Sequence, residues 1–192
     1  MSVRRLKEKA VILGMVLQGL EATPRVIGSS SAPSYGATFQ MAVDVWNPAE
    51  DLLTQQFEAQ DSVAKKSIYT GSSLVGSYTE LVRGDLEMIF LYYPLNGTHW
   101  CGAYSYPSFA ANPFSFAGMP SVGSTLVHGI RAEHFRVSVA AGSYITGAYT
   151  RAEGGAPLML TLPSQQQNWD FTFFDNTTTP PSRLFDVPEY CT

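Results

Sequence analysis

Charged residues are scarce in this chain, at 15% of its 192 residues, where about a quarter is usual. Lysine and arginine together number only 12 and the net charge is −4, which excludes nucleic-acid binding because no basic surface could neutralise a phosphate backbone. The three histidines, His99, His128 and His134, lack metal-ligand spacing. Dinucleotide, P-loop, G-x-S-x-G and H-E-x-x-H motifs are missing too. We therefore expect no cofactor, no metal and no catalytic residues.

Cysteine is rare as well, with only Cys101 and Cys191. One interpretation is a cytosolic protein with two free, buried thiols. The other is a protein of an oxidising compartment, which is also indicated by two N-x-T glycosylation sequons that begin at Asn96 and Asn176 in expected turns. The sequons and the few lysines favour a secreted protein or one of the secretory-pathway lumen, with the cell surface as a further possibility.

Glycine, proline and aromatic residues are plentiful by contrast, and the stretch 126–150 shows the clearest strand pattern. Phe135 and Val137 alternate there with His134 and Arg136, and a period of two predicts a strand with one buried face. A second run, 143–149, is rich in Tyr, Ile and Thr. The small-residue junction between the runs is short enough for a hairpin.

Similar patterns predict the rest of the sheet, with strands at 38–46, 52–60, 62–70, 73–82, 85–93, 99–106, 158–162 and 167–174. The run 85–93, DLEMIFLYY, is apolar at both parities, which predicts a central strand buried on both faces. The Pro- and Phe-rich stretch 107–123 predicts a loop, either a surface cover pinned by its aromatic residues or a lid over a pocket. We expect a mainly all-β fold of about ten strands, a curved antiparallel sheet forming a half-barrel, with a short N-terminal helix.

The chain divides into three parts by composition. Residues 1–22 carry four basic residues before a short apolar run, which fits either a signal peptide or an amphipathic N-terminal helix. Residues 23–37 are rich in Ser, Gly and Pro and predict a linker. Residues 38–192 then form a single β domain, whose tail from Pro180 onward is expected to be a strap.

Apolar rows follow from the alternation, because every second side chain of a strand points to the same face. One such row is expected to include Trp169, Phe171 and Phe173. If the rows face the concave side, they form a ligand surface, whose predicted lining residues are Met88, Phe90, Tyr92, Phe135, Val137, Trp169 and Phe171. The alternative is that these side chains make an ordinary packed core.

Two short motifs resemble ependymin-related and sea-urchin development-specific secreted proteins, a group that also includes the N-terminal regions of some protist cysteine proteases. Residues 127–135, VHGIRAEHF, are similar to the family pattern V-x-G-I-P-C-x-x-W, and residues 185–191, FDVPEYC, to F-D-x-P-x-Y-C. The resemblance implies a secreted, disulfide-bonded protein, similar in fold to bacterial lipoprotein carriers, whose curved sheet encloses a hydrophobic pocket.

This chain departs from that family at two positions. Ala132 stands where the family has cysteine and Phe135 where it has tryptophan, so one family disulfide is absent. The resemblance then implies that the remaining pair, Cys101 and Cys191, bridges a strand to the C-terminal strap.

Three hypotheses on function follow. The first is a non-catalytic secreted or lumenal module that binds an apolar small molecule or lipid in the concave sheet. The second is a structural or assembly subunit of a larger protein complex or extracellular matrix, with a filled core, whose partners are proteins or further copies of itself. The third is an accessory, prodomain-like module of a cysteine protease.

Overall fold

The computed structural model describes residues 31–73, 76–139 and 144–191, which form thirteen strands and three short 3-10 helices. The strands are β1 (Ser34–Gly36), β2 (Phe39–Asn47), β3 (Leu52–Asp61), β4 (Lys66–Ser73), β5 (Gly76–Arg83), β6 (Met88–Leu95), β7 (Thr98–Ser105), β8 (Phe114–Ser115), β9 (Ser121–Val127), β10 (Ile130–Val139), β11 (Tyr144–Arg151), β12 (Pro157–Leu162) and β13 (Gln167–Asp175). The helices are η1 (Pro163–Gln165), η2 (Ser182–Phe185) and η3 (Glu189–Cys191).

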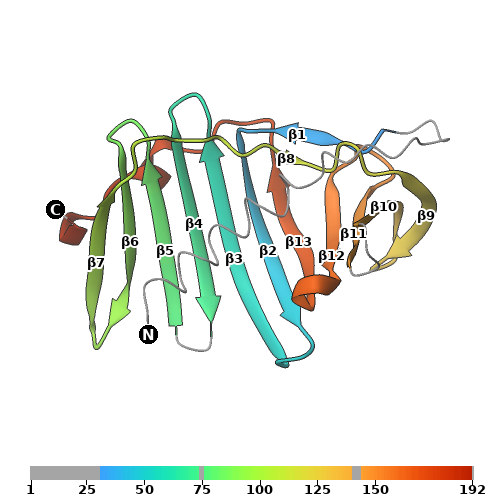
Figure 1. Ribbon diagram of the computed structural model, residues 1–192, viewed down its shortest axis with the longest axis horizontal. Helices are drawn as coiled ribbons and strands as arrows, with labels where there is room; N and C mark the ends of the chain where they lie inside the picture. Colours follow the sequence, from blue (N-terminus) through green and yellow to red (C-terminus); the bar gives the residue numbers. More distant parts are fainter. Residues whose placement is uncertain (1–30, 74–75, 140–143, 192) are drawn as a thin grey trace.

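Eleven of the strands form one curved, open antiparallel sheet (Figure 1). Its order is β7-β6-β5-β4-β3-β2-β13-β12-β11-β10-β9, so β7 and β9 are the two edges. The short strands β1 and β8 pair with each other in a second sheet. The predicted all-β half-barrel is therefore confirmed, whereas the predicted helix or signal peptide at 1–22 lies outside the described residues.

Turn chemistry explains two of the hairpins in this sheet. Asn96-Gly97 joins β6 to β7 and His128-Gly129 joins β9 to β10, in each case between paired strand ends. All four residues have positive φ, between 50° and 79°. Two-residue loops of this kind match the right-handed twist of the strands that they connect.

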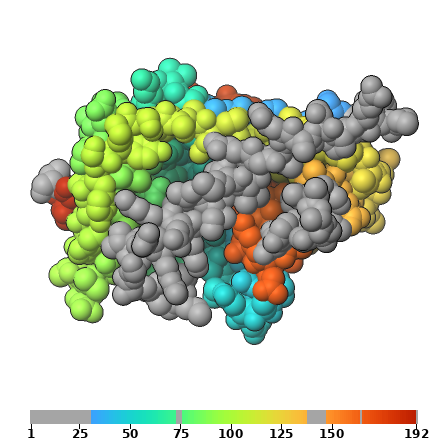
Figure 2. All heavy atoms as spheres, viewed as in Figure 1, coloured from blue at the N-terminus to red at the C-terminus, as the bar shows by residue number. Residues whose placement is uncertain are grey.

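One face of the sheet, here called the inner face, is covered at one end by the segment 106–120, which runs across the strands (Figures 1 and 2). Phe114, Phe116 and Met119 of this segment are buried against β2, β10, β12 and β13. The fully buried Gln60 fixes the segment further, since its Nε2 donates to Asn112 O at 2.9 Å and its Oε1 accepts from Asn112 N at 3.1 Å. Of the two interpretations of 107–123, this packing agrees with a cover pinned by its aromatic residues.

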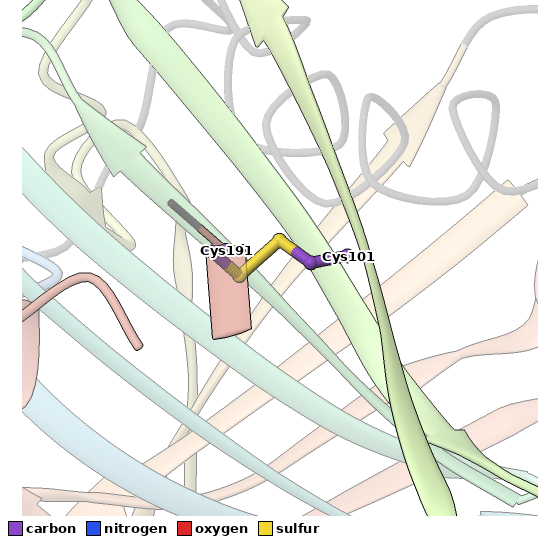
Figure 3. Close-up of a disulfide and its surroundings, with 2 residues drawn as sticks. All are labelled: Cys101 and Cys191. Atoms are coloured by element: carbon purple, nitrogen blue, oxygen red, sulfur yellow. A yellow bond between two sulfur atoms is a disulfide. The ribbon is translucent and has the colours of Figure 1, made fainter. Parts of the chain in front are cut away.

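The opposite face, here called the outer face, is covered between β3 and β7 by the C-terminal strap, residues 180–191. Phe185 of η2 is buried against a cluster that includes Leu81 and Phe90. Arg83 Nη1 donates to Phe185 O at 3.2 Å. Cys191 of η3 forms a disulfide with Cys101 of β7, with 5.3 Å between the two Cα atoms (Figure 3). The predicted disulfide and strap are therefore confirmed.

Several sequence-based expectations differ from the structure. The expected strand 85–93 begins only at Met88, because the chain turns at residues 84–87, and it is the neighbour of edge strand β7 rather than a central strand. The expected strand 62–70 likewise begins at Lys66, after a turn. Two further short strands, β1 and β8, lie in the expected linker and the expected loop.

The expected row of Trp169, Phe171 and Phe173 is also broken. The register of β13 against β2 shifts between Phe171 and Phe173, so that Phe173 pairs with Ala42 and is 46% exposed. An inserted residue reverses the parity of all that follows, which strict alternation cannot anticipate.

The disulfide closes a loop with a sequence separation of 90 residues. Replacing both cysteines by serine is expected to lower the free energy of unfolding by about 3 to 5 kcal/mol, because the unfolded chain regains the entropy of that loop. Urea unfolding monitored by tryptophan fluorescence measures the loss. Reduction of the wild-type protein should reproduce it, and an unchanged midpoint after reduction would contradict the expectation.

Phe116 and Phe173 form a matched pair of phenylalanines, the first fully buried under the segment 106–120 and the second half exposed. Phe116→Ala should cost about 3 to 5 kcal/mol of unfolding free energy, because it removes a large core side chain and leaves a cavity. Phe173→Ala should cost less than about 1 kcal/mol. Thermal unfolding of both variants tests this, and equal losses would show that Phe116 does not anchor the segment.

Candidate functional site

The structure divides the seven predicted ligand-lining residues between two faces. Phe135, Val137, Trp169 and Phe171 lie on the inner face, in the cluster under Phe114. Phe135 is only 1% exposed, so this part of the row is packed core. The other three residues, Met88, Phe90 and Tyr92, lie on the outer face in the cluster covered by the strap. The seven residues therefore do not form one surface.

The strand register explains why Met88, Phe90 and Tyr92 of β6 point to the outer face rather than to the inner face. Phe90 pairs with Leu81, which is in line with Ile68 and Ala59, and all four belong to the outer-face cluster. The inner-face residues of β6 are consequently Ile89, Leu91 and Tyr93. Because the run from Met88 to Tyr93 is apolar at both parities, the sequence held no signal that distinguished the two sets.

Aromatic side chains lie over glycines on the inner face of β4 to β7. Tyr69 and Tyr78 flank Gly71, where an added Cβ would lie 3.0 Å from atoms of each tyrosine. Trp100 and Tyr104 flank Gly102 in the same way, with contacts of 2.6 and 2.7 Å. Glycine is needed at both positions because the neighbouring side chains approach the backbone closely.

These aromatic side chains form two ring pairs. Tyr69 and Tyr78 share a hydrogen bond, with ring centroids 5.7 Å apart. Trp100 stacks on Tyr93, with centroids 4.9 Å apart. Tyr69, Tyr78, Tyr93, Trp100 and Tyr104 are all half-buried, so they form an aromatic surface at this end of the inner face. We call it the aromatic surface below.

A pair of carboxyl groups borders the aromatic surface. Glu58 of β3 pairs with Met41 on one side and Tyr69 on the other, and Tyr69 pairs in turn with Glu80 of β5. Burial, followed by the charge of Glu80, raises the pKa of Glu58 to about 7. Near neutral pH the carboxyl of Glu58 is therefore protonated in a large fraction of molecules and can donate as well as accept a hydrogen bond.

Next to Glu58 on the same face is an acceptor without a donor. The Oε1 atom of Gln56 is buried and accepts no hydrogen bond from the residues that the structure describes. Gln56 lies between Val43 and Gly71 in the sheet, so its amide is bordered by an apolar side chain and by a glycine. A buried acceptor without a donor costs about 1 to 3 kcal/mol, which a donor brought by a ligand would recover.

Among the described strand positions of this half of the inner face, the charged side chains have one sign. The strand pairing shows which residues of β2 to β7 point to the same face as Gln56 and Glu58. These residues include no lysine or arginine, but they include Glu80 as well as Glu58. The region thus combines aromatic and aliphatic surface with carboxyl groups. It suits an apolar group attached to a neutral or cationic hydrogen-bond donor.

The outer face carries a separate pocket of about 350 Å³ at the other end of the sheet. The β9–β10 turn is tied to β13 there, because His128 Nε2 lies 2.8 Å from Asp170 Oδ1. The ring of His134 stacks on Tyr149, with centroids 4.3 Å apart, and burial followed by the charge of Arg136 lowers the pKa of His134. The lining residues are Thr125, Leu126, Val127, His128, His134, Tyr149 and Met159. None of them was predicted from the sequence as a ligand contact.

The predicted covalent sites are placed as follows. Asn96 is exposed in the β6–β7 turn. Asn176 is exposed too, but its Nδ2, the atom that would carry a glycan, donates to Tyr35 O at 3.1 Å. The Sγ atom of Cys101 is bonded to that of Cys191, so Cys101 has no free thiol.

Two searches of the described residues give negative results. They contain no cluster of three or more His, Cys, Asp or Glu side chains placed to hold a metal ion. No helix within residues 31–73, 76–139 and 144–191 is long and apolar enough to cross a membrane.

Comparison with known proteins identifies the fold but no family. No family model matches the sequence, and no curated protein matches it at a significant level. The chain resembles the crystal structure of an uncharacterised conserved protein from Thermus thermophilus, with a TM-score of 0.51, 9% identity and 95% of each chain covered. At this identity the similarity shows the fold alone.

Two further solved structures align less well. One is MucB in complex with MucA(peri), with a TM-score of 0.38 and 14% identity over 80% of this chain and 55% of that chain. The other is the Pseudomonas aeruginosa MucA/MucB complex, with a TM-score of 0.38 and 14% identity over 81% and 57%. These scores are too low to support an argument about function.

The raised pKa of Glu58 makes stability depend on pH with a defined sign. Below about pH 4.5 the side chain is protonated in both states, and between pH 4.5 and 7 it ionises in the unfolded chain first, so rising pH favours unfolding. This ionisation should lower the unfolding free energy of the wild type by up to about 3 kcal/mol between pH 4.5 and a pH above 7. Glu58→Gln should lack this decrease, because glutamine does not titrate. Urea unfolding at pH 4.5 and pH 8 measures the difference.

The matched control is Glu87→Gln, which removes the same charge from an exposed turn. It should leave the difference between the two pH values within about 0.5 kcal/mol of the wild type. If Glu58→Gln behaves like this control, Glu58 is ionised in the folded protein at pH 7.

Proposed function

We propose that this protein is a non-catalytic, extracytoplasmic binding module that holds an amphiphile on the inner face of its sheet, between β3 and β7. The apolar part of the ligand lies on the aromatic surface. Its head group, a neutral or cationic hydrogen-bond donor, lies against Glu58 and Gln56. The observation that carries the proposal is the buried Gln56 Oε1, which has no hydrogen-bond partner among the described residues and lies next to a carboxyl group with a pKa raised to about 7.

Polar groups of this kind are costly in an apolar surface. A partly protonated carboxyl and an unsatisfied amide oxygen each lower the stability of the folded chain unless another group compensates them. Ligand sites commonly consist of apolar and aromatic surface with a few polar groups that fix the orientation of the ligand. The inner face between β3 and β7 has this composition, whereas the half under Phe114 is packed core.

The compartment is inferred from the disulfide. A bond between Cys101 and Cys191 persists in an oxidising environment, and the exposed sequon at Asn96 agrees with the secretory pathway. The motif FDVPEYC supports a relation to ependymin-related proteins, because its residues form the strap and its cysteine forms the disulfide. A signal peptide within residues 1–22 belongs to the same proposal.

Binding is tested with two fluorescent probes that share one long alkyl chain, one with an ammonium and the other with a carboxylate head group. The ammonium probe should bind more tightly at pH 8 than at pH 5, because Glu58 then carries a charge, and the carboxylate probe should show the reverse order. Glu58→Gln should remove most of the pH dependence of both probes. Isothermal titration or fluorescence titration gives the dissociation constants.

The apolar half of the site is tested with Trp100→Ala, which should weaken binding of both probes about tenfold, since it removes a large aromatic contact. Phe173→Ala, an exposed aromatic residue on the outer face, serves as the matched control and should leave binding unchanged. If the wild-type protein binds neither probe at pH 5 or pH 8, the proposal is wrong. If both variants weaken binding equally, the ligand lies elsewhere.

A further inference from the structure

A single strand sets the distance between the two polar groups of the proposed site. Gln56 and Glu58 lie two residues apart on β3, so both side chains point to the inner face. Residues at this spacing in a strand have Cα atoms about 6.6 to 6.8 Å apart. Side chains as long as those of glutamine and glutamate can converge over this distance on one atom between them.

Neither group receives a hydrogen bond from the part of the chain that the structure describes. Gln56 Oε1 is buried and lacks a donor there. The pKa of Glu58 is raised by burial and by the charge of Glu80, and no hydrogen bond to the carboxyl opposes this increase. One ligand atom with several donors could therefore satisfy two acceptors at once.

The surroundings of Gln56 allow its amide to face a ligand. Gln56 pairs with Gly71 of β4, and an atom of Tyr69 and one of Tyr78 each lie 3.0 Å from where a Cβ of residue 71 would be. A group held between Gln56 and Glu58 is therefore bordered by aromatic rings. The terminal torsion of a glutamine side chain is broad, so the amide can turn Oε1 toward this group without a change in the backbone.

We infer that the head group of the bound amphiphile is a primary ammonium, whose N–H groups donate to Gln56 Oε1 and to the carboxyl of Glu58 together. The inference rests on the proposed binding site and names its ligand class, the long-chain amines. A primary ammonium has three N–H donors on one compact nitrogen, enough for both acceptors. A quaternary ammonium has the charge but no N–H, and an alcohol has one O–H and no charge.

The charge of this face also favours an amine over an alcohol. Glu58 and Glu80 pair with Tyr69 from its two sides, and the described strand positions on this face of β2 to β7 include no lysine or arginine. A ligand ammonium beside Glu58 lowers the pKa of the carboxyl and so favours its ionised form. Hydrogen bonds between two charged groups are stronger than those between neutral ones.

Three compounds that share a decyl chain test the head group. Decylamine, decyltrimethylammonium and 1-decanol are each used at pH 8 to displace the fluorescent ammonium probe from the wild-type protein. At this pH an alkylamine is protonated, since its pKa is about 10.4, like that of lysine. Decylamine should bind at least about tenfold more tightly than either other compound. If the aromatic rings hold the cation instead, decyltrimethylammonium should bind at least as tightly as decylamine.

Gln56→Met tests the contribution of the amide, because methionine is similar in length to glutamine but lacks a strong acceptor. It should reduce the preference for decylamine over decyltrimethylammonium to about threefold or less. Gln55→Met is the matched control on the same strand. Gln55 points to the other face, where its exposed side chain donates from Nε2 to Asp44 Oδ1 at 3.3 Å. This control should keep the wild-type preference.

The stability of the ligand-free protein provides a second measurement. Gln56→Met should raise the urea midpoint, because it removes a buried acceptor that lacks a donor, whereas Gln55→Met should not raise it. A lower midpoint for Gln56→Met would show that Oε1 already has a donor in the folded chain, which would overturn the inference.

The outcomes distinguish the head group from the site. Equal binding of decylamine and decyltrimethylammonium, tighter binding of 1-decanol, or a Gln56→Met variant with the wild-type preference would overturn the inference and leave the proposed site in place. The comparison of the three compounds on the wild-type protein does not depend on any variant. If no decyl compound and neither fluorescent probe binds, both the site and the inference are wrong.

Discussion

The pairing of β2 with β13 is the contact on which the rest of the sheet depends. β2 to β7 follow one another along the chain as neighbours, and so do β9 to β13, so each group is a meander built from local hairpins. Only β2 with β13 joins the two groups, through residues far apart in sequence. The complete curved sheet requires this long-range pair, whose closure costs more chain entropy than closure of the local hairpins does.

Joining two meanders produces a sheet whose faces need different covers. The inner face under β10 to β13 is covered by the aromatic residues of the segment 106–120, and the outer face of β3 to β7 is covered by the strap. The inner face of β4 to β7 has instead an aromatic surface and a pair of glutamates. This half-buried region lies between the packed inner-face core and the edge strand β7, and it is the region that we assign to binding.

Much of the sheet follows from the sequence, because strands such as β2 alternate strictly and bury every second residue from Phe39 to Val45. The fold class was predictable from the few charges and the many turn residues. The disulfide between the strand and the strap was expected from the family resemblance, because the two cysteines alone also allowed free thiols. The faces were not predictable. Met88 to Tyr93 is apolar at both parities, so only the cross-strand register decides that Phe90 points outward and Leu91 inward. The bulge after Phe171 and the pairing of Glu58 with Tyr69 depend in the same way on contacts between strands. No local pattern encodes them.

The bond between Cys101 and Cys191 also gives the molecule an unusual covalent form. The chain from residue 101 to residue 191 is a closed ring that contains β9 to β13 and the strap, and β2 to β6 lie outside it. A single cut anywhere in this ring, for example in the segment 106–120, leaves all the pieces joined. A protease that nicks the cover of the inner face would therefore release no fragment, and the nicked molecule would keep its mass, apart from one added water, until it is reduced.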